Sequence, residues 1–305
     1  MKFSVVLTAA FPPITRDILA AHFDVIEHPT EHDRTDEEVM MLVAEADAAI
    51  TLLSDPVTRR VLESNPNLRI VSNFAVGFNN VDIEAARELG VVVTNTPGVL
   101  TEATADLTMA LLLAVTRRIV EGDAEIRATR RCEWEPLKLL GTSLQGKRLG
   151  IVGMGRIGSA VASRARAFGM EVIGVRKGDP LDELLTTSDV ISLHTPLTAE
   201  TRHLIDAGAL SKMKPGAYLI NTARGALVDE SALCDALEQG RLRGAALDVY
   251  EEEPTVNPRL LDLDNVVLAP HIGSATEEAR NAMGRIAATN VLLFLRGQEP
   301  LHRVV

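Results

Sequence analysis

Short apolar runs rich in β-branched residues alternate with helical stretches along most of the chain, and this alternation limits the fold more than any other feature. Parallel strands need crossover connections, usually helices, so the pattern predicts parallel sheets. The first series of predicted strands is Val5–Thr8, Asp24–Glu27, Ala48–Leu53, Arg69–Ser72 and Val91–Thr94. We expect this series to form a doubly wound, flavodoxin-like α/β domain.

A second series of strands follows an apolar helix predicted from Thr101 to about Ile119. These strands are Arg148–Val152, Glu171–Val175, Asp189–His194, Ala217–Asn221, Ala245–Val249 and Val266–Ala269. They predict a second doubly wound, Rossmann-like sheet. The final helix, at about Glu277–Arg296, is long enough to return to the first domain. We therefore predict a discontinuous substrate domain, 1–98 and 283–305, and a dinucleotide-binding domain, 99–282, with a cleft between them.

Composition limits the possible partners. The 305 residues are 46% hydrophobic and include 42 acidic against 31 basic residues, for a formal net charge of −11. A charge of that sign disfavours binding to nucleic acid or to an anionic membrane, and no apolar run approaches the ~20 residues that a spanning helix needs. Cys132 and Cys234 lie far apart and predict neither a disulfide framework nor a metal site. We expect a cytoplasmic protein without a metal.

A glycine-rich segment stands where a phosphate-binding turn is expected. Its residues, Gly153-Met154-Gly155-Arg156-Ile157-Gly158, follow the strand Arg148–Val152 and open a predicted helix. Such glycines permit a tight turn and close approach of the backbone to a pyrophosphate, while the helix N-terminus supplies N–H groups. We predict dinucleotide contacts from Gly153, Gly155, Arg156, Ile157 and Gly158.

Two cations end the next strand, where an NAD site usually places an acidic residue. They are Arg176 and Lys177, and the nearest carboxylate, Asp179, comes too late in the sequence. Adjacent cations suit a 2′-phosphate, whereas a carboxylate would repel it. We predict NADPH as the preferred cofactor and NADH as a weaker one; a solvated pair of cations in a loop is the alternative interpretation.

Charged residues follow three later strands of the second sheet, at the edge where ligands bind in open α/β sheets. They are Arg224, the acids Glu251–Glu253, and His271. Arg224 could hold the carboxylate of a 2-keto acid, and His271 could protonate the carbonyl oxygen with an acid beside it. A surface arginine, a core histidine and a solvated acidic loop are the alternatives.

Other cofactor contacts are expected at the same edge. His194 ends a strand, and we interpret the following Thr195 and Pro196 as cofactor contacts. Further contacts are predicted at Thr104, Thr222, Ala223, Gly273 and Ser274.

Together these motifs resemble the D-isomer-specific 2-hydroxyacid dehydrogenase family over nearly the whole chain. The resemblance rests on the glycine loop and on His194–Thr198, Asn221–Gly225, Asp248–Pro254 and Pro270–Gly273. It implies that Arg224, Glu253 and His271 are catalytic. It also implies that backbone groups of Val76 and Gly77 hold the substrate carboxylate and that Asp248 faces the nicotinamide amide.

Within the family, Asn95–Asp106 and the pair Arg176-Lys177 are most similar to glyoxylate and hydroxypyruvate reductases. This similarity implies a homodimer joined through the cofactor domain, with Trp134 reaching the neighbouring active site; simple interface packing of Trp134 is the alternative. The loop Ser72–Asp82 carries no Lys or Arg, which favours a small unphosphorylated acid. A phosphoglycerate or broader 2-hydroxyacid dehydrogenase, and a corepressor-like sensor of the cofactor without turnover, are the competing predictions.

Overall fold

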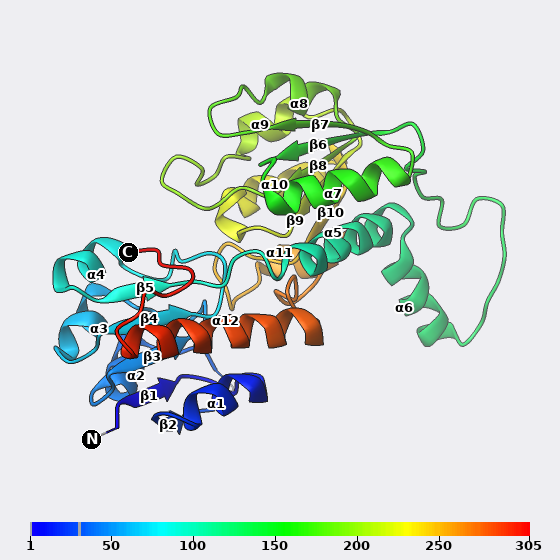
Figure 1. Ribbon diagram of the computed structural model, residues 1–305. Coiled ribbons are helices and arrows are strands. Elements are labelled where there is room, and N and C mark those ends of the chain that lie inside the picture. The colour runs from blue at the N-terminus through cyan, green and yellow to red at the C-terminus, as the bar shows by residue number, and fades with distance from the viewer. Residues whose placement is uncertain (1, 30–31) are drawn as a thin grey trace. The chain divides into compact units, whose positions relative to one another are not determined.

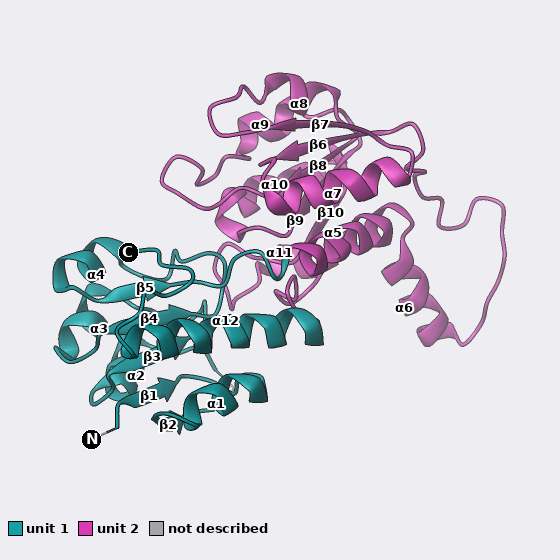
Figure 2. Ribbon diagram, viewed as in Figure 1, with its two compact units in different colours: residues 1–100, 275–305 teal, residues 101–274 magenta. Residues whose placement is uncertain are grey.

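Two parallel sheets organise the chain, one in each of two units (Figure 2). The computed structural model describes residues 2–29 and 32–305. Unit 1 is Met1–Leu100 with Ala275–Val305, and unit 2 is Thr101–Ser274. The sequence placed the second division at 282/283, whereas the structure places it at 274/275, ahead of the final helix.

The sheet of unit 1 has the strand order β2-β1-β3-β4-β5, all parallel (Figure 1). Its strands are β1 (Ser4–Leu7), β2 (Asp24–Glu27), β3 (Ala48–Thr51), β4 (Ile70–Asn73) and β5 (Val92–Thr94). β3 and β4 are buried throughout, as expected for apolar strands covered on both faces, while the edge strand β2 is mostly exposed. This order is the flavodoxin-like one, so the predicted fold class is confirmed for this unit.

Helices cover both faces of that sheet. They are α1 (Pro13–Ala20), α2 (Asp36–Val43), α3 (Arg59–Ser64), α4 (Ile83–Leu89) and α12 (Glu277–Leu295). α2 begins with a capping box, in which the side chains of Thr35 and Glu38 each bond the other's backbone N–H. α12 packs on α1 and β4, so the returning helix that the sequence predicts completes unit 1.

The sheet of unit 2 has six parallel strands in the order β11-β10-β9-β8-β6-β7. They are β6 (Arg148–Val152), β7 (Glu171–Val175), β8 (Val190–Leu193), β9 (Ala217–Asn221), β10 (Leu242–Leu247) and β11 (Val266–Leu268). The strand order reverses between β6 and β8, which creates the switch point where doubly wound folds bind ligands. β10 begins before the expected Ala245, and its pairing with β9 is irregular between Leu242 and Gly244. The predicted Rossmann-like sheet is confirmed.

The helices of unit 2 form a layer on each face of this sheet. They are α5 (Thr101–Thr116), α6 (Ile119–Thr129), α7 (Arg156–Ala167), α8 (Asp182–Thr187), α9 (Ala207–Lys212), α10 (Glu230–Glu238), α11 (Pro258–Leu261) and the 3₁₀ helix η1 (Gly225–Leu227). Leu112 of α5 and Val161 of α7 belong to the same core cluster as Ile151 on one face. Leu184 of α8 and Leu233 of α10 belong to the core on the other face.

The helix expected from Thr101 to about Ile119 ends at Thr116, and a second helix that the sequence did not predict follows it. α5 ends at Thr116, Arg118 adopts a left-handed φ of 53°, and α6 starts at Ile119. None of the residues of α6 is buried. A helix without a buried face does not need the apolar periodicity by which a packed helix is recognised in a sequence.

Within residues 2–29 and 32–305, no helix combines the length and the apolar character that crossing a bilayer requires.

Candidate active site

The glycine loop after β6 has the geometry of a phosphate-binding turn. Gly153 has a φ of 100°, and a Cβ there would lie 2.5 Å from the carbonyl oxygen of His194. A Cβ on Gly158 would lie 2.2 Å from the carbonyl oxygen of Gly153, so the helix approaches the turn too closely for a side chain. At Gly155 a Cβ would meet no described atom within 4 Å. The turn and the first residues of α7, Arg156 and Ile157, therefore fit a dinucleotide pyrophosphate.

The cations at the end of β7 are not equivalent. Lys177 Nζ is 2.8 Å from a carboxylate oxygen of Glu200, and this hydrogen bond raises the pKa of Lys177. Arg176 is exposed. Its backbone N–H donates to Asp179 Oδ2 at 2.8 Å. Asp179 therefore lies closer to the strand end than its place in the sequence indicates, because the turn folds its carboxylate back.

A histidine and a carboxylate meet after β10 and β11. Nδ1 of His271 lies 2.8 Å from Oε2 of Glu253. An ionised carboxylate can only accept, so Nδ1 donates and Nε2 is left to carry a transferable proton. Burial acts to raise the pKa of Glu253, but the hydrogen bond and charge of His271, the N–H of Tyr250 and the charge of Arg224 hold this pKa below its ordinary value. Glu253 is thus ionised at neutral pH.

Arg224 follows β9, and a local turn fixes its position. The side chain of Asn221 donates to the carbonyl oxygen of Arg224 at 2.8 Å and accepts from the N–H of Ala223 at 3.0 Å. Burial lowers the pKa of Arg224 and the charge of Glu253 opposes this, yet a guanidinium stays charged at neutral pH. Sequence reasoning gave Asn221 no role, although asparagine is a common turn residue at a strand end.

Asp248 holds the turn that carries His271. It is fully buried, and its two carboxylate oxygens accept the N–H groups of Ile272 and Gly273 at 2.7 and 2.8 Å. Burial raises the pKa of Asp248, while these N–H groups and the charge of His271 act in the opposite direction. His271 has a φ of 49°, a conformation that costs energy outside glycine and needs such support. Asp248, which the family resemblance predicts to face the nicotinamide amide, therefore also fixes the turn that carries His271.

Two threonines of α5 and the threonine that follows β9 lie beside the histidine turn. Thr104 donates to the carbonyl oxygen of Gly273 at 3.0 Å. Thr108 donates to the carbonyl oxygen of Thr104 at 2.8 Å, and its hydroxyl lies 2.9 Å from that of Thr222. The structure thus brings the predicted residues Thr104, Thr222 and Gly273 together, and Ala223 and Ser274 adjoin them in the chain. Thr108 was not predicted; its place one helical turn after Thr104 was the available signal.

The segment after β8 passes directly over the glycine loop. Because a Cβ on Gly153 would touch the His194–Thr195 peptide, the predicted contact Thr195 lies beside the turn, and the predicted contact Pro196 follows it in the chain. Burial lowers the pKa of His194 to about 4, and its Nε2 is 2.8 Å from the hydroxyl of Ser192. His194 is therefore a neutral imidazole at physiological pH.

The predicted substrate residues Val76 and Gly77 lie in unit 1, in the loop after β4. Asn95 donates its side-chain N–H to the carbonyl oxygen of Val76 at 2.8 Å, and Asn73 donates to that of Gly77 at 2.9 Å. Two side-chain amides thus fix the backbone of this loop.

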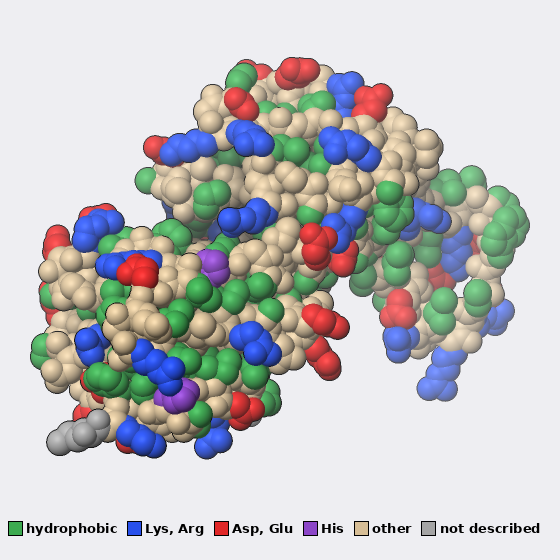
Figure 3. Space-filling model, viewed as in Figure 1, with side chains coloured by type: hydrophobic (Ala, Val, Ile, Leu, Met, Phe, Trp, Pro, Cys, Tyr) green, Lys and Arg blue, Asp and Glu red, His purple; other side chains and the backbone are tan. Residues whose placement is uncertain are grey.

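An apolar arm, residues 119–140, extends from unit 2. Figure 3 shows hydrophobic side chains over α6 and the loop that follows it, at the right of the view. Trp134 is 86% exposed and Leu137 80% exposed, and Ile119, Val120, Ile126 and Leu140 are also exposed. Large exposed apolar patches are typical of interaction surfaces.

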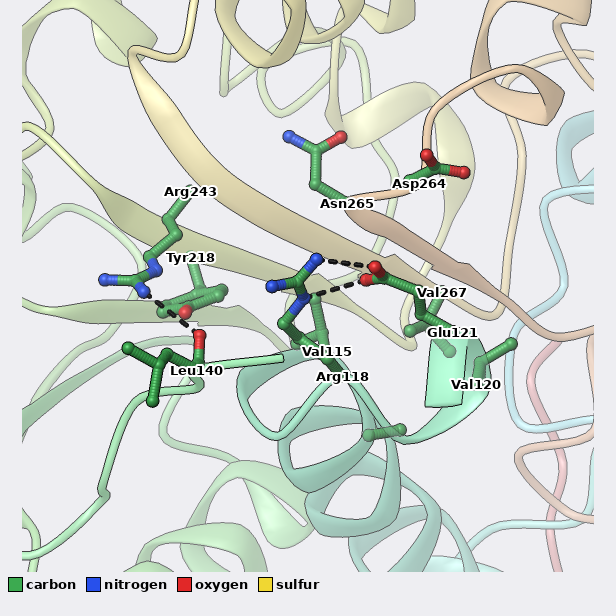
Figure 4. A pocket seen from close by; sticks show the side chains of 11 residues that line it. Val115, Arg118, Val120, Glu121, Leu140, Tyr218, Arg243, Asp264, Asn265 and Val267 are labelled. Carbon is green, nitrogen blue, oxygen red and sulfur yellow. Dashed lines mark hydrogen bonds and ion pairs between the residues drawn. The ribbon is translucent and has the colours of Figure 1, made fainter. Parts of the chain in front are cut away.

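A cavity of about 180 Å³ lies at the base of this arm (Figure 4). Tyr218, Arg243 and Val267 line it from the amino ends of β9, β10 and β11, and Arg118 pairs across it with Glu121 at 2.5 Å. Ligands of open α/β sheets bind at the carboxyl ends of the strands, so this cavity is not the cofactor site.

Comparison with known proteins identifies the chain's relatives. Residues 109–273 match the model described as D-isomer specific 2-hydroxyacid dehydrogenase, NAD binding domain. A glyoxylate reductase from Thermococcus litoralis is 53% identical over 275 residues, which are 85% of this chain and 83% of that protein. A glyoxylate reductase from Aeropyrum pernix is 47% identical over 307 residues, 94% of this chain and 91% of that one.

Solved structures agree in fold. The TT0316 protein from Thermus thermophilus superposes with a TM-score of 0.93 and 47% identity, over 99% of this chain and 100% of that one. An NADPH-dependent glyoxylate/hydroxypyruvate reductase from Sinorhizobium meliloti, in complex with NADP and malonate, has a TM-score of 0.88 and 33% identity, over 100% and 97% of the chains.

Proposed function

The chain belongs to the D-isomer-specific 2-hydroxyacid dehydrogenase family and is an oxidoreductase that acts on CH–OH groups. From this premise we propose that it reduces glyoxylate and hydroxypyruvate to D-2-hydroxy acids with NADPH. The hydrogen bond from His271 Nδ1 to Glu253 carries the proposal. It leaves Nε2 as the proton donor, at the strand edge that also holds Arg224. The choice of glyoxylate as substrate rests on the similar proteins that are named glyoxylate reductases.

Three side chains of unit 2 have separate roles in the proposed reaction. Arg224 anchors the substrate carboxylate through a bidentate pair. Glu253 stabilises the imidazolium form of His271 through Nδ1. This imidazolium donates its Nε2 proton to the carbonyl oxygen as negative charge develops there, and His271 is left as a neutral imidazole. The nicotinamide, when bound, supplies the hydride. Backbone N–H groups of Val76 and Gly77 hold the substrate carboxylate from the substrate domain, 1–98 and 283–305.

The dinucleotide-binding domain, 99–282, holds the cofactor in this proposal. The pyrophosphate lies on the glycine loop and the start of α7, and Arg176 with Lys177 binds the 2′-phosphate, so that NADH is the weaker cofactor. The remaining contacts come from Thr104, Thr195, Pro196, Thr222, Ala223, Asp248, Gly273 and Ser274. The NADP complex of the similar Sinorhizobium meliloti reductase supports this assignment.

The apolar arm supports a homodimer joined through unit 2, in which Trp134 reaches the neighbouring active site. The net charge of −11 supports a protein that binds neither nucleic acid nor an anionic membrane. The distant Cys132 and Cys234 support the proposed cytoplasmic location. Sedimentation of wild type and Trp134→Ala tests the dimer: a wild type that sediments as a monomer at micromolar concentration contradicts it.

A steady-state assay tests the activity. Glyoxylate, hydroxypyruvate, pyruvate and phosphohydroxypyruvate would each be offered with NADPH and with NADH. We expect the highest kcat/KM for glyoxylate or hydroxypyruvate with NADPH. Equal or better use of NADH refutes the cofactor preference, a preference for the phosphorylated acid favours a phosphoglycerate dehydrogenase, and NADPH binding without turnover favours a sensor.

A further inference from the structure

Two acids that the proposed chemistry does not use join separate segments behind Glu253. Glu230 begins α10 and is only 6% exposed. The N–H of Glu251 donates to Glu230 Oε1 at 2.6 Å, and the N–H of Glu230 donates to Glu251 Oε2 at 3.4 Å. Each carboxylate thus bonds the backbone of the other residue, and we call this reciprocal pair the bracket.

The bracket also reaches the segment after β8. The other oxygen of Glu251, Oε1, accepts a hydrogen bond from His203 Nε2 and lies 3.4 Å from Arg202 Nη2. His203 has a left-handed φ of 50°, and its N–H donates to the carbonyl oxygen of Ala226 in η1 at 2.9 Å. Glu251 therefore joins the loop after β10 to two other segments of unit 2.

The bracket carries an energetic cost. Burial raises the pKa of Glu230, and the charges of Glu251, Glu252 and Glu253 add to that rise, while the N–H of Glu251 opposes it. A carboxyl group among other acids and away from water is unfavourable. Such costs are typical of positions where a defined geometry serves function.

The loop held by the bracket is the one that aims Glu253. Glu253 Oε1 accepts the N–H of Tyr250 at 2.9 Å, and the Tyr250 hydroxyl donates to the carbonyl oxygen of Ala269, just before His271, at 2.9 Å. On the other side, a Cβ on Gly225 would lie 1.8 Å from the carbonyl group of Tyr250, so η1 presses on the Tyr250–Glu251 peptide. The loop is therefore fixed between β11 and the start of α10.

We propose that Glu230 and Glu251 are positioning residues that hold Glu253 against Nδ1 of His271 and keep the loop in register with the Arg224–Gly225 segment. The proposal rests on the catalytic role proposed for the Glu253–His271 pair. It predicts that loosening the bracket weakens that hydrogen bond without changing any group that touches substrate or cofactor.

The test compares Glu230→Ala with Glu230→Gln, because the glutamine keeps an oxygen that can accept the N–H of Glu251. Glu238→Gln is the matched control: it lies on the same helix, and its exposed carboxylate pairs with Arg259 at 2.8 Å. We expect kcat to fall roughly 10-fold in Glu230→Ala with little change in KM, since small misplacements of catalytic groups have effects of this size or larger. Glu230→Gln should restore most of the rate.

A spectroscopic readout separates positioning from general stability. The proton shared by His271 Nδ1 and Glu253 should give a downfield ¹H NMR signal in the protein alone, assigned by its loss in His271→Ala. We expect the signal to weaken in Glu230→Ala and to persist in Glu230→Gln and Glu238→Gln. A folded Glu230→Ala protein with wild-type kcat and an unchanged signal overturns the proposal.

Two further outcomes are also decisive. If Glu230→Ala does not fold, Glu251→Ala takes its place, because that change removes the acceptor of the Glu230 N–H at a partly exposed position; an unchanged rate and signal there overturn the proposal. If the wild type reduces no keto acid but the signal still responds to Glu230→Ala, the bracket stands and the proposed function fails.

Discussion

The carboxyl edges of the two sheets carry polar networks of different kinds. In unit 1, the buried Asp55 accepts hydrogen bonds from Thr8 Oγ1 at 2.5 Å and from the N–H of Leu52 at 2.7 Å, and it pairs with Arg34 at 3.3 Å. Asn80 donates to the carbonyl oxygens of Leu52 and Asp55 at 3.1 and 3.0 Å. These groups bond one another and tie neighbouring loops together.

In unit 2 the charged groups at the same edge are partly exposed instead of buried. The side chains of His271 and Glu253 are 27% and 30% exposed, and their mutual bond leaves Nε2 of the imidazole for another partner. Since both sheets have the strand reversal of a doubly wound fold, topology alone does not distinguish them. The comparison teaches that the fold provides an edge, and that the side chains there decide whether it supports structure or chemistry.

His271→Ala should have the largest effect of the variants considered, because it removes the proposed catalytic group at the edge of unit 2. Removing the proposed general acid should lower kcat by about 10²–10⁴-fold while NADPH binding, followed by fluorescence titration, is retained. His22→Ala, on the surface of unit 1, is the control and should leave kcat unchanged. A His271→Ala protein with wild-type kcat would exclude the proposed proton donor.

Arg34→Met should affect stability through the network of unit 1. The side chains of Arg34 and Asp55 are 6% and 1% exposed, and removing one partner of a buried pair costs about 3–5 kcal/mol. Urea unfolding would measure this loss. Arg60→Met removes the exposed pair Arg60–Glu37 and should cost less than ~1 kcal/mol. Equal losses in the two variants would contradict the structural role assigned to the buried network.

Lowering the pH should reduce the stability of the protein through His194, at the edge of unit 2. Its folded pKa of about 4 lies below the ordinary 6.5, so the unfolded chain binds the proton first and stability falls as the pH drops from 6.5 towards 4. The shift corresponds to a loss on the order of 3 kcal/mol. Urea unfolding across this range should show a smaller loss in His194→Gln. Identical pH profiles for the two proteins would show that His194 is not the group that titrates.

Arg176→Ala should have the smallest of these effects and sharpens the cofactor assignment. Losing one charge-assisted contact to the 2′-phosphate should reduce the kcat/KM preference for NADPH over NADH about 10-fold. Lys177→Ala should change it less, because Glu200 already pairs with Lys177. Arg166→Ala, at the end of α7, is the control. An unchanged preference in Arg176→Ala would move the 2′-phosphate site elsewhere.

Local pattern was enough to locate the strands of both sheets. β2, β6, β7 and β9 have the predicted bounds. β6, β7 and β9 are mainly apolar runs, whereas β2 has only Val25 and Ile26 between two acids. The early start of β10 was missed because Arg243 and Gly244 interrupt the apolar run. α6 was missed because it packs no buried face against the unit.

The sequence by itself determined the two doubly wound sheets, the glycine loop and the candidate groups Arg224, the acids Glu251–Glu253 and His271. These depend on short-range pattern and on the rule that ligands meet the carboxyl ends of parallel strands. Only the tertiary structure decided which of the three acids faces His271, that Asp248 holds the histidine turn, and that Glu230 reaches the backbone of Glu251. These are contacts between residues far apart in the chain. Their distances are set by the packing of loops and helix starts, which residue spacing does not encode.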